Sequence, residues 1–190
     1  MPSAFRDFAR RLRAFRDDTG GSLTVEAAIL IPALFWAFGT TFVFFDAFRQ
    51  NGINQKAAFT IGDMLSRETN VITPEYLDNT RNLLEMLTGM DSADLAVRVS
   101  MIRFDADADD HDLRWSQTRG GVQPLDNSDI ADWESVLPVM VDEEQIIVVE
   151  TFADWSPVFD IGFGETRFAS FVFTRPRFAP QLHWQDTSDP

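Results

Sequence analysis

Carboxylates stand at two places in this sequence where their surroundings suggest chemistry. Glu26 directly precedes a run without charged residues, Ala27 to Phe45. A carboxylate at the edge of a hydrocarbon layer is costly unless it finds a positively charged partner, so Glu26 is a candidate ion-pairing group. Further along, Asp105 to Asp112 reads DADADDHD. Closely spaced carboxylates supply the oxygen ligands that calcium prefers.

The acidic run departs from the pattern of a calcium-binding loop. An EF-hand needs glycine at its sixth position and glutamate at its twelfth, where this sequence has Asp110 and Ser116. We therefore interpret Asp105 to Asp112 as the solvated tip of a hairpin, whose charges discourage pairing at the sheet edge. Weak calcium binding is the alternative.

Residues suited to enzymatic catalysis are sparse. The chain has no cysteine, which excludes disulfides, thiolate metal sites and a cysteine nucleophile. Its histidines, His111 and His183, belong to no recognisable pair or motif. Hydrolytic sites need a nucleophile with a base, or a metal with converging ligands, so we expect neither an enzyme nor a cofactor. Four tryptophans are more typical of a core or an interface than of a ligand site: Trp115, Trp133, Trp155 and Trp184.

The uncharged run from Ala27 to Phe45 has the length of a membrane span. A hydrocarbon core about 30 Å thick needs roughly 20 apolar residues in a helix. A buried core helix would normally show a polar stripe, which this run lacks. A cleaved secretory signal would have a shorter apolar region followed by a small-residue cleavage site. We therefore predict one transmembrane span.

Basic residues flank this span unequally, and the side richer in Lys and Arg stays in the cytoplasm. Only Arg49 and Lys56 follow closely, whereas five arginines precede the span: Arg6, Arg10, Arg11, Arg13 and Arg16. We expect a cytoplasmic N-terminus, with the chain after about Asp46 exported across the inner membrane. The net charge of −14 arises entirely from that exported part, because residues 1–26 are slightly basic. Because phosphate binding needs clustered Lys and Arg, we expect no nucleic-acid partner.

The region from Phe15 to Glu68 resembles the TadE/TadF minor pseudopilins of the tight adherence (Tad) system, which are type IV pilin-like proteins. Their pattern is a short basic leader, a glycine, a glutamate at the fifth mature position and a proline within the membrane helix. The matching residues here are Gly21, Ser22 as the new N-terminus, Glu26 and Pro32. The resemblance implies that a prepilin peptidase cuts between Gly21 and Ser22 on the cytoplasmic side.

The resemblance also implies roles and partners. Gly21 lacks a side chain and can enter a protease groove in extended form; otherwise it is a flexible loop residue. Glu26 can pair with the freed amino group of Ser22, its own or a neighbour's, although a first-turn glutamate also gains about 0.3–1 kcal/mol from the helix dipole. Pro32 predicts a mild kink near Leu30. The implied partners are the peptidase, other pilins and pseudopilins, and the inner-membrane pilus assembly platform.

Helical periodicity continues past the span. Ile53, Ala57 and Ile61, with Met64 or Leu65, recur at helical spacing, so we expect one helix from about Leu23 to Arg67 whose second half packs on the exported domain. Four polar residues occupy the intervening positions of this pattern: Asn54, Gln55, Asp63 and Arg67. Glycine weakens a helix, so Gly52 and Gly62 are candidate break points.

The remaining chain predicts an α+β domain with an antiparallel sheet, of the kind seen in pilin-like proteins. Thr73 and Pro74 begin a helix that ends at Gly89. Strands are predicted at 95–104, 113–118, 146–152 and 167–174, with a short helix at 130–136. The continuous apolar run at 146–152 places that strand at the centre of the sheet. The organisation is a leader at 1–21, a helix at 22–67 and an exported acidic domain at 68–190.

Two functions agree with this sequence. The first is a minor pseudopilin or pilus assembly component, cleaved after Gly21 and anchored by one membrane helix. The second is an uncleaved single-pass envelope protein whose exported domain binds a partner or calcium. Processing distinguishes them, because a simple anchor keeps its leader.

Overall fold

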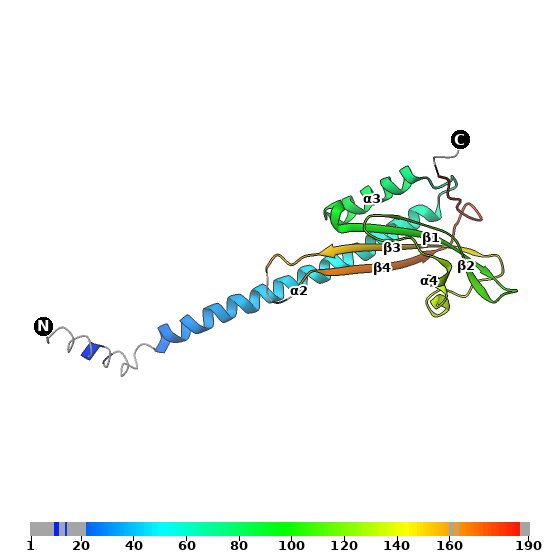
Figure 1. The fold of residues 1–190 in the computed structure, drawn as a ribbon. Helices are drawn as coiled ribbons and strands as arrows, with labels where there is room; N and C mark the ends of the chain where they lie inside the picture. Colours follow the sequence, from blue (N-terminus) through cyan, green and yellow to red (C-terminus); the bar gives the residue numbers. More distant parts are fainter. Residues whose placement is uncertain (1–9, 12–13, 15–21, 160–161, 163, 187–190) are drawn as a thin grey trace. The chain divides into compact units, whose positions relative to one another are not determined.

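A computed structural model describes residues 10–11, 14, 22–159, 162 and 164–186 of the chain (Figure 1). The chain forms two compact units, Met1–Phe44 and Phe45–Pro190. The second unit contains the whole sheet and is called the α+β unit below. The helix α2 (Ser22–Ser66) contributes residues to both units.

Four antiparallel strands form the sheet in the order β2-β1-β3-β4. Their bounds are β1 Leu95–Asp105, β2 Asp110–Arg119, β3 Gln145–Trp155 and β4 Thr166–Thr174. Each one contains a predicted strand. The apolar run in β3 lies inside the sheet, between β1 and β4, as a strand buried on both faces should. The α+β class and the antiparallel sheet are therefore confirmed.

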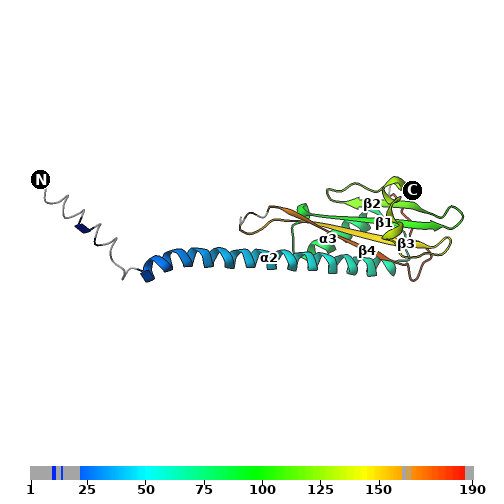
Figure 2. The same cartoon turned by 90° about the horizontal axis from the view of Figure 1, so that it is seen from below.

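One face of the sheet packs against helices. Figure 2 shows α3 (Pro74–Thr88) and the part of α2 in this unit on the same side of the sheet. Alternate residues of β1 and β3, such as Val97 and Val149, face these helices because side chains alternate along a strand. The fully buried core includes Ile61 and Leu65 of α2, Leu77 and Leu84 of α3, and Ile72 and Leu182. The second half of α2 thus packs on the sheet, as predicted.

The opposite face of the sheet has its own apolar cluster. Ile102, Ile146 and Val148 pack there against residues of the segment between β2 and β3, including Leu125 and Ile130. Both faces of the central strands are consequently buried, which explains why β3 reads as a continuous apolar run.

The helix α2 is continuous from Ser22 to Ser66, close to the predicted bounds. The breaks considered at Gly52 and Gly62 do not occur. A Cβ at Gly62 would lie 3.5 Å from Val172 Cγ1 of β4, so this glycine sits where the helix approaches the sheet. Its penalty of about 1 kcal/mol is offset by the packing of the buried helix face.

The helix α3 begins and ends as predicted. Thr73 Oγ1 accepts a hydrogen bond from Tyr76 N at 3.2 Å, and Pro74 occupies the first turn. Gly89 ends the helix in the left-handed region, with φ of 67°, which glycine adopts without steric cost. Its N–H donates to Glu85 O at 2.8 Å.

Two predicted elements have different bounds in the structure. The strand predicted from Leu113 begins earlier, at Asp110, because Arg103 pairs with Asp112 and the Phe104 and His111 rings lie 5.1 Å apart. The helix predicted at 130–136 is wrong in extent. A short α4 (Asn127–Ile130) and a 3₁₀ turn (Trp133–Ser135) replace it. Asp129 Oδ2 accepts from Asp126 N at 2.8 Å and starts the helix earlier.

Candidate functional site

The first half of α2 presents an apolar surface that the protein does not cover. Within the described part of the chain, one helix is long and apolar enough to cross a membrane, by length and composition, and only 6% of its most apolar 18-residue stretch is buried. Large apolar side chains of this part of the helix are exposed, including Ile29, Leu34, Phe35, Trp36 and Phe38. The core helix of a soluble protein would bury them, so this helix suits a lipid environment.

Two threonine hydroxyls within this stretch donate hydrogen bonds to backbone carbonyls of the same helix. Thr40 Oγ1 donates to Trp36 O and Thr41 Oγ1 donates to Ala37 O, each at 2.9 Å. Hydroxyls bonded to the carbonyl four residues earlier need no water, so they are compatible with hydrocarbon. Pro32 lies inside the helix, which continues on both sides of it. The kink near Leu30 stays a prediction.

The predicted motif residues fall at the start of α2. Gly21 lies outside the described residues, and Ser22 is the first residue of the helix. Glu26 is exposed one helical turn later. The explanation of Glu26 as a first-turn glutamate is wrong, since the first turn of α2 holds no acidic residue and the dipole effect falls off beyond it.

Asp46, the first charged residue after the apolar run, is hydrogen-bonded to a residue of the sheet. Trp155, the last residue of β3, donates its indole N–H to Asp46 Oδ2 at 3.0 Å. Arg49 Nη2 lies 3.6 Å from Asp46 Oδ1. The Trp155 and Phe168 rings are 6.0 Å apart and join the end of β3 to β4. The sequence placed Trp155 in a core or interface, but no spacing signal linked it to Asp46.

A polar cluster lies buried between α2 and the sheet. The prediction that Asn54 is one of the polar residues between the apolar positions of the helix face is wrong, because its side chain is fully buried. Its Nδ2 donates to Ser170 Oγ at 3.1 Å and to Thr151 O at 3.4 Å. Gln50, one turn earlier, donates to Thr88 O at 3.2 Å. The sequence contains a signal for this burial, because four residues at helical spacing share one face of the helix: Gln50, Asn54, Ala57 and Ile61.

Two atoms of this cluster have no hydrogen-bond partner: Asn54 Oδ1 and Thr151 Oγ1. We predict that Thr151→Val leaves the free energy of unfolding unchanged or raises it, because valine has the same shape without an unpaired hydroxyl. Ser170→Ala should lower it by about 1 kcal/mol, since it removes the acceptor for Asn54. Urea denaturation of the detergent-solubilised chain measures both. A Thr151→Val variant that loses as much stability as Ser170→Ala would show that the hydroxyl is bonded.

The carboxylates at the acidic hairpin tip are arranged around the guanidinium of Arg103. Arg103 forms ion pairs with Asp112, with Glu143 at 2.9 Å and with Asp105 at 3.5 Å. The hydrogen bond to Asp112 raises the pKa of Arg103. Asp105 Oδ1 accepts from the backbone N–H of Asp107 at 3.1 Å, which closes the turn. The described residues contain no group of three or more potential ligands placed to hold a metal ion.

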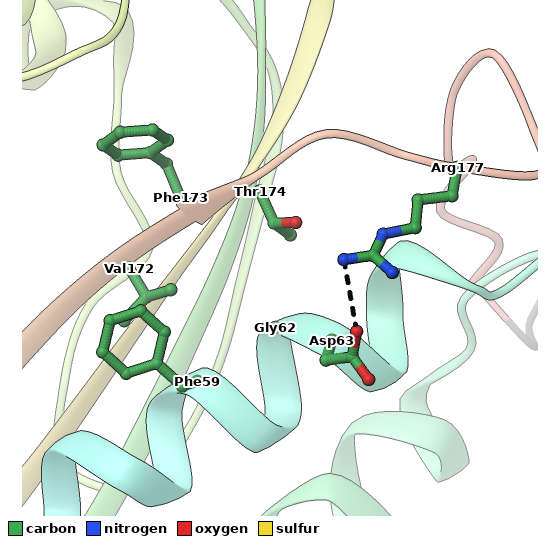
Figure 3. A pocket seen from close by; sticks show the side chains of 7 residues that line it. All are labelled: Phe59, Gly62, Asp63, Val172, Phe173, Thr174 and Arg177. Carbon is green, nitrogen blue, oxygen red and sulfur yellow. Dashed lines mark ion pairs between the residues drawn. The ribbon is translucent and has the colours of Figure 1, made fainter.

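A small pocket lies where α2 passes β4 (Figure 3). Phe59 and Gly62 of α2 and Val172 of β4 form its apolar wall. At its other end, Arg177 Nη2 lies 3.5 Å from Asp63 Oδ1. Neither histidine lines this pocket, since His111 contacts the Phe104 ring and His183 contacts Gln181.

The chain was also compared with known proteins. No family model matches it, and no curated protein or solved structure does so either.

Proposed function

We propose that this protein is a minor pseudopilin or pilus assembly component of the Tad type, anchored by α2 in the inner membrane. The observation that carries the proposal is a single helix with two different halves. Its first half is uncharged from Ala27 to Phe45 and mostly exposed, while its second half packs on an antiparallel sheet through Ile61 and Leu65. A pilin-like subunit needs this combination of a lipid-facing stem and an attached α+β domain.

The start of the helix supports the same proposal. α2 includes Ser22, the residue that would become the N-terminus after cleavage, and Glu26 lies four residues further along the same helix. In this proposal a prepilin peptidase cuts the bond between Gly21 and Ser22 on the cytoplasmic side. The freed ammonium of Ser22 then lies one turn from the Glu26 carboxylate, or pairs with Glu26 of a neighbouring subunit. Either ion pair removes the cost of an unpaired carboxylate at the hydrocarbon edge.

The proposed topology places the N-terminus in the cytoplasm and the α+β unit in the periplasm. The Arg-rich sequence before α2 and the acidic sequence after it support this orientation. The partners in this proposal are the peptidase, other pilins and pseudopilins, and the inner-membrane assembly platform. Their recognition would use α2, whose exposed apolar side chains are available to lipid and to neighbouring helices.

Adjacent glycines offer a matched test of the processing site. We predict that Gly21→Val abolishes cleavage in cells with the cognate prepilin peptidase, because a branched side chain obstructs an extended backbone in a protease groove. Gly20→Val should be cleaved far more efficiently, since its side chain lies one residue away from the bond. Immunoblotting of membrane fractions measures both. Equal cleavage of the two variants and the unaltered chain would remove Gly21 from the site and favour an uncleaved anchor.

A further inference from the structure

The α+β unit has a second apolar segment at the level where the membrane span ends. Asp46 directly follows Phe45, the last uncharged residue of the span, so it marks the edge of the hydrocarbon. Trp155 is 6% exposed and donates its indole N–H to Asp46 Oδ2 at 3.0 Å. This contact holds the end of β3 beside Asp46.

Beyond Trp155 the chain exposes large apolar side chains. Val158 is 67% exposed and Phe159 is 54% exposed, directly after Pro157. On α2, Phe45 and Phe48 flank Asp46 and are 69% and 73% exposed. Apolar side chains that gather on an exposed surface commonly mark a contact site, and aromatic residues are enriched where a protein meets the headgroup region.

The charges near this segment suit a lipid headgroup layer. Asp154 is paired with Arg167, with Nε to Oδ1 at 2.6 Å, and this hydrogen bond lowers the pKa of Asp154. Asp46 is within 3.6 Å of Arg49. The carboxylates of Asp46 and Asp154 are thus partly neutralised, and both arginines have side chains at least half exposed, which can reach lipid phosphates. The strongly acidic remainder of the unit repels anionic lipid, so apolar contact must supply the attraction.

We propose that residues 156–159, directly after β3, form a second membrane contact, in which Val158 and Phe159 enter the headgroup region of the bilayer beside the end of the α2 span. The partner is the lipid surface in which α2 is anchored, so the inference depends on the membrane anchor of the proposed function. It does not depend on cleavage at Gly21. Two points of attachment would restrict rotation of the α+β unit about α2 and present its other surfaces in a fixed direction.

The absence of cysteine from the sequence makes the test direct. Single-cysteine variants of the full chain carry a nitroxide spin label in vesicles of phosphatidylcholine, and power saturation compares collisions with oxygen and with a water-soluble nickel chelate. Val158→Cys reports on the second membrane contact. Val139→Cys is the matched control, because Val139 is 95% exposed and lies near the end of β4 that is remote from Trp155. Its carbonyl accepts a hydrogen bond from Arg175, which directly follows that end of the strand. Leu34→Cys reports on the span.

We expect the oxygen-to-nickel ratio at Val158 to exceed that at Val139 at least threefold, with the highest ratio at Leu34. A Val158 label as accessible to nickel as the Val139 label, with Leu34 inside the bilayer, would overturn the second membrane contact and leave the anchor in place. A Leu34 label that is accessible to nickel would overturn the anchor and, with it, the second membrane contact.

Discussion

Glu150→Ala is expected to lower the free energy of unfolding of the α+β unit by about 3 kcal/mol, because it leaves a largely buried guanidinium without its carboxylate. Arg98 of β1 binds Glu150 of β3 through two parallel hydrogen bonds, of 2.6 Å from Nε and 2.7 Å from Nη2. The side chains are only 16% and 11% exposed. After the substitution, the contacts left to Arg98 are Gln123 O at 3.0 Å and the Phe152 ring at 5.5 Å.

An exposed ion pair of the same geometry provides the control. Arg167 of β4 binds Asp154 of β3 through two bonds of 2.6 Å, with side chains 50% and 42% exposed. Asp154→Ala should cost less than about 1 kcal/mol, because water solvates the freed arginine. Urea denaturation followed by tryptophan fluorescence measures both variants. Similar losses for Glu150→Ala and Asp154→Ala would mean that burial does not determine the value of the Arg98–Glu150 pair.

Gly120→Ala is expected to cost about 3 kcal/mol. Gly120 has φ of 99°, a backbone conformation that other residues adopt only with strain. An added Cβ would lie 2.5 Å from Leu95 O and 2.6 Å from Ala96 Cβ. Both atoms belong to the start of β1, and they cannot move without disturbing the β1–β2 pairing that begins at Val97 and Arg119.

Gly121 is the neighbouring control for this substitution. A Cβ there would have no heavy atom within 4 Å, and no positive φ requires glycine. Gly121→Ala should therefore change the free energy of unfolding by less than about 0.5 kcal/mol. The difference between the two variants, measured by urea denaturation, isolates the close approach of the chain to β1. Equal stability of Gly120→Ala and Gly121→Ala would contradict the geometry described for this turn.

Much of the fold could be predicted because its signals are local. Alternating residues in β1 and β4 and the apolar run in β3 have the periods of strands with one or two buried faces. Thr73, Pro74 and Gly89 supply the cap, first turn and end of α3. That the helix around Ala27 to Phe45 is long and apolar enough to cross a membrane could be predicted from length and the absence of charge alone.

Other features depend on tertiary contacts that local patterns do not contain. Asn54 reads as a surface residue but is buried, because Ser170 and the carbonyl of Thr151 lie opposite it across the interface of helix and sheet. The three extra residues at the start of β2 depend on the partner that Arg103 finds in Asp112. The bond between Trp155 and Asp46 joins residues 109 positions apart. Such contacts follow from the assembled fold rather than from sequence spacing.

We propose that the chain is processed to a mature subunit whose membrane helix begins at Ser22. The most direct measurement is the N-terminal residue and intact mass of the protein, extracted from membranes of cells with the cognate prepilin peptidase. We expect a mature chain that starts at Ser22, with a mass lower than that of the full chain by the mass of residues 1–21. A chain that still starts at Met1 or Pro2, while the peptidase cleaves another substrate in the same cells, would contradict it.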